Sequence, residues 1–189
     1  MDKYLSIKLK KIEVAKKQLD CALRLHFNEE EEIISKHTLG AASLQILHDL
    51  AEKKGMDTYI FGAQFSHLNV DRGKIIKNLR KPQNFFKHSS KEDIDDTIEF
   101  VSEMTDLFLI DGCDIYKRLT GIRDPLHTLY ELWFVKKYPD IAMDDIYKGR
   151  VDEIIGEISI EDRKRFYSIL LPEVERVFHP SIKANTERS

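Results

Sequence analysis

Apolar residues recur every three or four positions along most of the chain, which is the spacing of one face of an α-helix. This pattern predicts a first helix over 2–27, with lysines between its apolar positions. It predicts a second helix over 35–54, which Ser35 caps and Gly55 ends. The segment 56–70 follows neither the helical nor the strand period, so we expect a loop with a short piece packed on the core.

A Pro inside a helical pattern divides the next part of the chain. A third helix is predicted from Asn69 or Asp71 to about Arg80. Pro82 lacks a backbone N–H and clashes in a helix interior, so the pattern predicts a kink and a new turn over 82–88. A connection follows, in which 97–100 is a candidate extended segment.

The remaining helices carry clearer boundaries. Ser102 is expected to cap a largely buried helix over 103–119, which Gly121 ends. Asp124 followed by a first-turn Pro starts another helix, which stops before Pro139. The stretch 141–178 is helical again, with a break near Gly156 and a restart at Ser159. The chain ends in a polar tail.

These elements predict an all-α single domain, a bundle of about six to eight helices, because strand signals are too few for a sheet. Residues 1–139 are expected to form the bundle core, 140–178 a helical extension of the same domain, and 179–189 a frayed tail. A chain of 189 residues with 42% hydrophobic residues is enough for a core of ordinary size.

Composition excludes several functional classes. Cys21 and Cys113 form no metal-binding pattern and are expected to be buried thiols, so no metal or cofactor is predicted. Charges interrupt the N-terminal segment too often for a signal peptide, and no apolar run approaches the length of a membrane span. We therefore expect a cytoplasmic protein without a membrane partner.

The net charge of −3 gives no global attraction to nucleic acid, but the local charge is uneven. The segment 72–91 contains seven of the thirty Lys and Arg residues and no acid, whereas 92–114 contains nine acids and no Lys or Arg. Two interpretations stay open. The two stretches are solvated faces that pair with each other, or the basic one binds an anionic ligand.

The strongest candidate site lies in the basic stretch, in the sequence Asn84-Phe85-Phe86-Lys87-His88. If 82–88 is helical, an amide, an ammonium and an imidazole lie on one side, with the two Phe anchoring the turn. Such a set binds phosphate, and the imidazole transfers protons near neutral pH. The structural alternative is that Asn84 braces the kink and His88 ends a helix against its dipole. The residues concerned are Arg80, Asn84, Lys87 and His88 as catalytic candidates, and Arg80, Lys81, Lys87 and His37 as ligand-binding candidates.

The motif NFFKH, preceded by a helix that opens with His37-Thr38-Leu39, resembles that of a family of uncharacterised bacterial helical proteins. Their motif usually reads NFFKHAD, whereas Ser89-Ser90 follows His88 here. The similarity covers roughly residues 17–139. This resemblance implies a helical fold but no established activity.

The helix count and the polar motif ending in His also resemble HEPN-type domains of toxin–antitoxin and phage-defence systems. That resemblance implies a dimeric, metal-independent ribonuclease with an Arg, four to six intervening residues and a His. In this chain seven residues separate Arg80 from His88, and three separate Arg123 from His127. Gln83 stands before Asn84, where such motifs often have Arg.

Other polar residues are weaker candidates. His37 at a helix start is a candidate base or a bracing group. Asp111 and Asp114 are candidates to orient His88 or Lys87, or to form an ion-pair network in which Asp114 pairs with Arg118. The other histidines are expected to be surface or satisfied groups: His26, His48, His67, His127 and His179.

Three hypotheses follow. In the first, a HEPN-like protein binds RNA or a phosphate-bearing ligand through the basic segment. A ribonuclease of this kind would use His88 to move protons and Arg80 or Lys87 to stabilise charge. In the second, the chain is a non-catalytic interaction or homodimerisation module. In the third, the NFFKH motif is purely structural.

Overall fold

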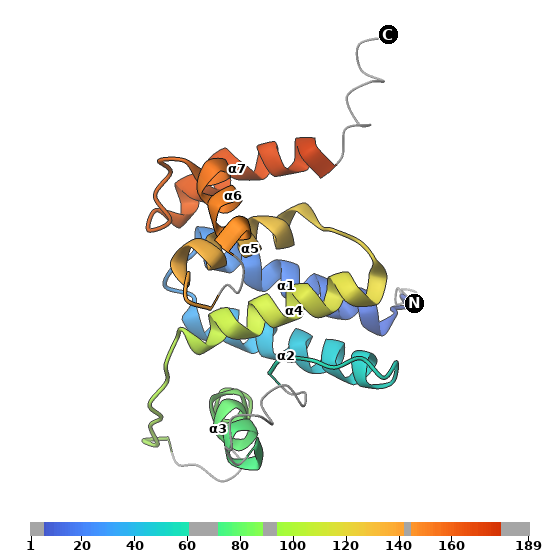
Figure 1. Ribbon diagram of the computed structural model, residues 1–189. Coiled ribbons are helices and arrows are strands. Elements are labelled where there is room, and N and C mark those ends of the chain that lie inside the picture. Colours follow the sequence, from blue (N-terminus) through green and yellow to red (C-terminus); the bar gives the residue numbers. More distant parts are fainter. Residues whose placement is uncertain (1–5, 61–71, 89–93, 142–144, 179–189) are drawn as a thin grey trace, which may run out of the picture.

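The computed structural model describes residues 6–60, 72–88, 94–141 and 145–178, and within these ranges the protein is an all-helical bundle (Figure 1). The helices α1, α2 and α4 pack together and hold most of the core, and α5 lies against them. α7 packs against α1 and α5, while α3 lies beside α2 on the opposite side of the bundle. The helices of the described ranges are α1 (Lys11–Asn28), α2 (Ile33–Glu52), α3 (Arg72–Phe85), α4 (Met104–Thr120), α5 (Pro125–Lys137), α6 (Asp145–Ile155) and α7 (Arg163–Phe178).

The first helix begins later than the apolar spacing predicts. Residues 6–10 are exposed and not helical, and Leu9 is 54% exposed. The helix begins at Lys11 because the Glu13 carboxylate accepts a hydrogen bond from the Lys10 backbone N–H at 3.1 Å. This bond satisfies one of the free donors at the helix start, as a capping box does.

The local signals for the C-terminal end of α4 and for the start of α5 are confirmed, whereas the predicted caps Ser35 and Ser102 are wrong, because α2 begins after Glu32 and α4 after Glu103. Gly121 adopts a left-handed φ of 73° and its N–H donates to the Lys117 carbonyl, which closes α4. The Asp124 carboxylate accepts from the Leu126 N–H at 2.9 Å, which starts α5 one residue before its N-terminal Pro. The predicted restart at Ser159 is wrong. Asp162 caps the last helix instead, by accepting from the Arg165 N–H at 3.0 Å.

The small residues Gly40, Ala41 and Ala42 of α2 allow α4 to approach closely. A Cβ added at Gly40 would lie 2.9 Å from a Leu109 methyl, and one at Gly112 would lie 3.3 Å from a Leu19 methyl. Both glycines therefore sit where two helices touch. Cys113 is buried, as predicted, whereas Cys21 is exposed, contrary to the prediction.

Candidate functional site

The basic segment forms one helix, α3, that runs through Pro82 without a break. This differs from the predicted division at Arg80-Lys81. Pro82 lies in the last turn of α3, where a missing N–H costs a single hydrogen bond and the helix ends three residues later. The turn predicted over 82–88 is thus the end of α3. The Phe86 N–H donates to the Pro82 carbonyl at 2.9 Å.

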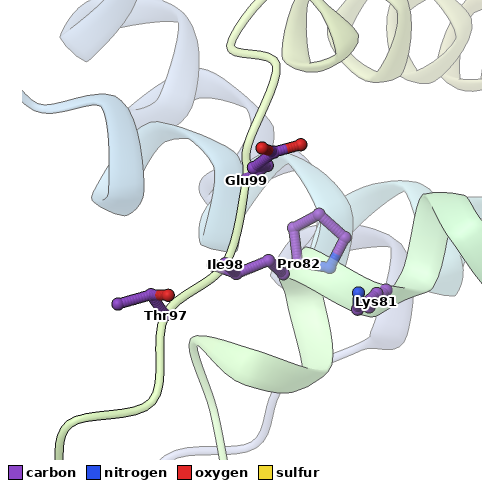
Figure 2. Close-up of a pocket in the computed structure, with 5 residues that line it drawn as sticks. All are labelled: Lys81, Pro82, Thr97, Ile98 and Glu99. Carbon is purple, nitrogen blue, oxygen red and sulfur yellow. The ribbon is translucent and has the colours of Figure 1, made fainter.

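A groove separates α3 from the non-helical segment that leads into α4. It has two adjoining hollows, one of about 300 Å³ and one of about 470 Å³. Figure 2 shows the larger hollow, where Pro82 and Ile98 lie beside each other with the Glu99 carboxylate above them. The side of α3 provides Lys77, Lys81, Pro82, Asn84 and Phe85, and the facing segment provides Asp96, Thr97, Ile98 and Glu99.

The facing wall has backbone groups without internal partners. Residues 97–99 belong to no helix or strand, and their N–H and C=O groups make no hydrogen bond within the described chain. Thr97 and Glu99 are exposed, so water satisfies these groups in the free protein. The groove therefore presents two lysines on the α3 wall, and two carboxylates with free backbone donors and acceptors on the facing wall.

The other residues of the NFFKH motif follow the end of α3. The backbone N–H groups of Lys87 and His88 donate to the Asn84 carbonyl at 3.2 and 3.0 Å, so the three residues share one helical turn. The Lys87 and His88 side chains are exposed, while Asn84 lines the smaller hollow. Burial of its stem lowers the pKa of Lys87. The amide, ammonium and imidazole are thus next to each other and open to solvent.

The Arg80 side chain contacts α2 and not the groove. Its guanidinium donates to the Gln45 Oε1 of α2 at 2.9 Å and is partly buried. The contact fixes α3 to α2. Arg80 does not line the groove, whose lining includes Lys81 one residue later.

His37 lies beneath the NFFKH motif. Its side chain is 1% exposed and is packed between the rings of Phe86, Phe100 and Phe108, at centroid distances of 5.7, 4.8 and 5.2 Å. Its Nδ1 lies 2.9 Å from the Thr105 Oγ1. Burial, together with the nearby Lys87 and Lys36 charges, lowers its pKa to about 4, so His37 is neutral at pH 7. His37 does not line either hollow of the groove.

The acids of α4 take partners other than His88 and Lys87. Asp114 pairs with Arg118 at 2.8 Å, as predicted. Asp111, which is 3% exposed, accepts from the backbone N–H groups of Tyr59 and Ile60 at 3.4 and 3.0 Å. Asp111 therefore holds the segment after α2 against α4 and does not orient the NFFKH motif.

The buried position of Asp111 predicts a pH-dependent stability. Burial raises the pKa of this carboxyl to about 6, although the two N–H donors oppose the shift. The folded state then binds a proton between about pH 4 and 6 that the unfolded state, with an Asp pKa near 3.9, has lost. This group therefore lowers the free energy of unfolding as pH rises through that window. We expect Asp111→Asn to gain on the order of 2 kcal/mol relative to wild type between pH 4.5 and 7.5. Urea unfolding at both pH values measures this difference, and parallel curves for the two proteins would contradict it.

A buried polar cluster at one end of the bundle was missed by the sequence prediction. His26 of α1 is fully buried, and Asp106 of α4 and Lys36 of α2 are 3% and 5% exposed. The Asp106 Oδ2 accepts from the Lys137 Nζ at 3.1 Å and from the Tyr138 hydroxyl at 2.8 Å, and its Oδ1 lies 3.6 Å from the His26 Nδ1. His26 is thus neither a surface residue nor a satisfied one, because neither ring nitrogen has a hydrogen-bond partner. Its single signal in the sequence is its place on the apolar face of α1, between Leu23 and Phe27.

A second polar cluster joins α1 to the start of α5. Asp20, Asp124 and His127 place three ligand atoms within 4.8 Å of one another, a spacing that suits a cation. The Lys16 ammonium already lies between the two carboxylates, at 2.6 Å from Asp20 and 2.8 Å from Asp124. The His127 Nε2 lies 2.9 Å from the Asp20 Oδ1. Because the lysine supplies the positive charge, the cluster is an ion-pair network that fixes α5 on α1.

Comparisons with protein-family models, curated proteins and solved structures found no match for this chain. Among the helices of the described ranges, none is long and apolar enough to cross a membrane.

Proposed function

We propose that this protein binds single-stranded RNA in the groove along α3. The observation that carries the proposal is the groove itself, which places Lys77, Lys81 and Asn84 along one wall, with Phe85 beside them. The net charge of the chain is −3 and the facing wall carries Asp96 and Glu99, so attraction of a polyanion depends on the α3 side, where residues 72–91 hold seven cations and no acid.

The two walls offer complementary contacts to a nucleotide. The ammonium groups of Lys77 and Lys81 suit phosphates, and the Asn84 amide suits a phosphate oxygen or a base edge. Phe85 and Ile98 provide an apolar surface for an unstacked base, as in sites that recognise single strands. The carboxylate of Glu99 and the free backbone groups of 97–99 can accept or donate to base edges.

Hydrolysis of the bound RNA is the further step that the NFFKH motif would add. In this reaction the His88 imidazole would transfer a proton at the ribose hydroxyl or the leaving oxygen, and the neighbouring Lys87 would stabilise the phosphorane charge. Both side chains are exposed at the end of α3, one turn after Asn84. Arg80 would have to leave Gln45 to take part.

The test of binding replaces the two groove lysines together. We expect Lys77→Gln/Lys81→Gln to weaken binding of a labelled single-stranded RNA by about tenfold or more, because two phosphate contacts are lost. The slope of log Kd against log salt concentration should also decrease, by roughly 0.7 for each phosphate contact that is lost. Fluorescence anisotropy at several salt concentrations measures both effects.

A matched control removes the same charge elsewhere. Lys53 and Lys54 are exposed at the end of α2, so Lys53→Gln/Lys54→Gln should bind RNA like wild type. Equal loss in the two double variants would show non-specific attraction and would contradict a groove site. Product formation that persists in chelator and disappears in His88→Ala would establish hydrolysis in addition to binding.

The free backbone of 97–99 favours a second candidate function, which is pairing with a second copy of this chain. A non-helical segment with unpaired N–H and C=O groups can serve as a template for strand addition. Ile98→Pro removes one donor and should abolish such a dimer in sedimentation velocity, while RNA binding through the lysines would persist. A monomer at all protein concentrations would exclude this candidate.

A further inference from the structure

Five helix ends meet where the buried polar cluster lies. His26 is near the end of α1 and Lys137 is the last residue of α5, whereas Lys36, Asp106 and Arg163 lie in the first turns of α2, α4 and α7. Figure 1 shows these ends on one side of the bundle. The N-termini of α2, α4 and α7 favour negative charge there, whereas the C-terminal ends of α1 and α5 favour positive charge, so the side chains decide the balance.

The side chains in this region carry more positive than negative charge. The cations are Lys36, Lys137 and Arg163, and Asp106 is the buried acid. Glu103, the other acid close enough to affect Lys36, is exposed at the rim. Asp106 is already bonded to Lys137 and Tyr138. One buried carboxylate therefore faces three cations.

Lys36 is the largely buried cation of this group. It is 5% exposed, yet its ammonium makes no hydrogen bond and no ion pair within 4 Å in the described part of the chain. Burial lowers the pKa of Lys36, Asp106 opposes that shift, and Arg163 and Lys137 add to it. Because two cations oppose the attraction of Asp106, further negative charge beside this ammonium would stabilise it.

The Arg163 guanidinium lies in the same region and has N–H groups available for a ligand. Its guanidinium stacks over the Trp133 ring at 5.4 Å from the centroid and has no acidic partner within the described ranges. A stacked guanidinium is held in one plane and keeps its fork of N–H groups free for an oxyanion. Lys137 lies over the same ring at 4.8 Å.

We infer that a phosphate group binds here, held by Lys36, Lys137 and Arg163 at the N-termini of α2, α4 and α7. Phosphate fits better than a metal ion because Lys36, Lys137 and Arg163 are cationic N–H donors. His26 is fully buried with its ring edge-on to those of Tyr130 and Trp133, and we assign it no contact with the ligand. This site is separate from the groove along α3 and does not depend on the proposed function.

The position of the sole tryptophan gives a direct readout. Trp133 lies under both Arg163 and Lys137, so a bound phosphate should change its emission. The experiment titrates the full chain with inorganic phosphate at constant ionic strength, with chloride as the control salt. Glycerol phosphate, with glycerol as its neutral control, is the second arm. Equal or tighter binding of glycerol phosphate indicates an organic phosphate ligand, and binding of inorganic phosphate alone indicates the free ion.

Three variants test the assignment. Lys36→Met and Arg163→Gln should each weaken phosphate binding by about tenfold or more, because each removes a charged donor. Arg165→Gln, an exposed cation two residues along α7, should bind phosphate like wild type. Lys77→Gln/Lys81→Gln should also retain the response, which separates this site from the groove.

The stability of the free protein provides an independent check. Lys36→Met keeps roughly the length of the side chain and removes a charge that burial and two neighbouring cations disfavour, so it should raise the melting temperature without phosphate and abolish the increase with phosphate. The proposal is overturned if phosphate and chloride have equal effects on wild type, or if Lys36→Met and Arg163→Gln respond to phosphate as wild type does.

Discussion

Replacing Asp106 by Ala is expected to lower the free energy of unfolding by about 3–5 kcal/mol, the cost typical of removing one partner from a buried charge cluster. Asp106 is 3% exposed and its Oδ2 accepts from both Lys137 and Tyr138. Without it, Lys36, Lys137 and Arg163 repel one another at the end of the bundle with no buried counter-charge. Urea unfolding followed by circular dichroism measures the loss.

The exposed ion pair between Lys136, the residue before Lys137, and Asp152 serves as the control for this prediction. Lys136 pairs with Asp152 at 2.6 Å, but its side chain is 38% exposed and that of Asp152 is 59% exposed. Water and salt screen such a pair, so Asp152→Ala should cost less than about 1 kcal/mol. If Asp106→Ala and Asp152→Ala lowered the free energy of unfolding by similar amounts, burial of the Asp106 carboxylate would make no difference to its contribution to stability.

A double variant identifies the physical cause of the loss. If repulsion among the cations is responsible, adding Lys36→Met to Asp106→Ala should restore part of the stability, because one of the unpaired charges is gone. If the loss came from the missing bonds to Lys137 and Tyr138 alone, the second substitution would restore nothing. The comparison therefore separates the electrostatic contribution from the hydrogen bonds.

Features encoded within a few residues could be predicted from the sequence. Gly121 and the Asp124-Pro125 pair set helix ends by local geometry alone, and both act as expected. The start of α7 was misplaced because Ser159 and Asp162 are both good caps, and the sequence does not say which one the core selects. The same limit applies to the start of α1, where helical spacing extends beyond the capping bond at Glu13.

Features that depend on several helices could not be predicted. Periodicity places His26 and Lys36 each on a face of its own helix, but not opposite Asp106, which lies 80 residues after His26 in the chain. The contact between His37 and Phe86 also depends on how two helices pack, so the sequence did not predict it. The sequence picked out both HTL and NFFKH, but only the packed structure places a ring of the second motif on the imidazole of the first. The groove could not be predicted either, because it forms only when residues 96–99 pack opposite α3. Those residues lie in the acidic stretch and carry no recognisable motif.

Replacing Trp133 by Ala is the other substitution with a large expected effect, about 3–5 kcal/mol in the free energy of unfolding. Trp133 is 1% exposed and packs against His26 at 4.2 Å and Tyr130 at 5.5 Å between ring centroids. Its indole N–H donates to the Ile160 carbonyl at 3.0 Å, which links α5 to the segment before α7. The truncation leaves a cavity and an unpaired carbonyl at once. Tyr59→Ala, which removes a ring that is 42% exposed, should cost less than about 1 kcal/mol.

Trp133→Phe separates the packing from the hydrogen bond. The phenyl ring fills much of the volume, so most of the cavity cost disappears, while the Ile160 carbonyl still lacks its donor. We expect a loss of about 1–2 kcal/mol, measured by circular dichroism because the variant has no tryptophan fluorescence. A Phe variant as unstable as the Ala variant would mean that the bond to Ile160, and not the aromatic packing on His26, holds α7 to the bundle. A Phe variant as stable as wild type would remove any role for the indole N–H and leave the stacking of the rings as the whole contribution.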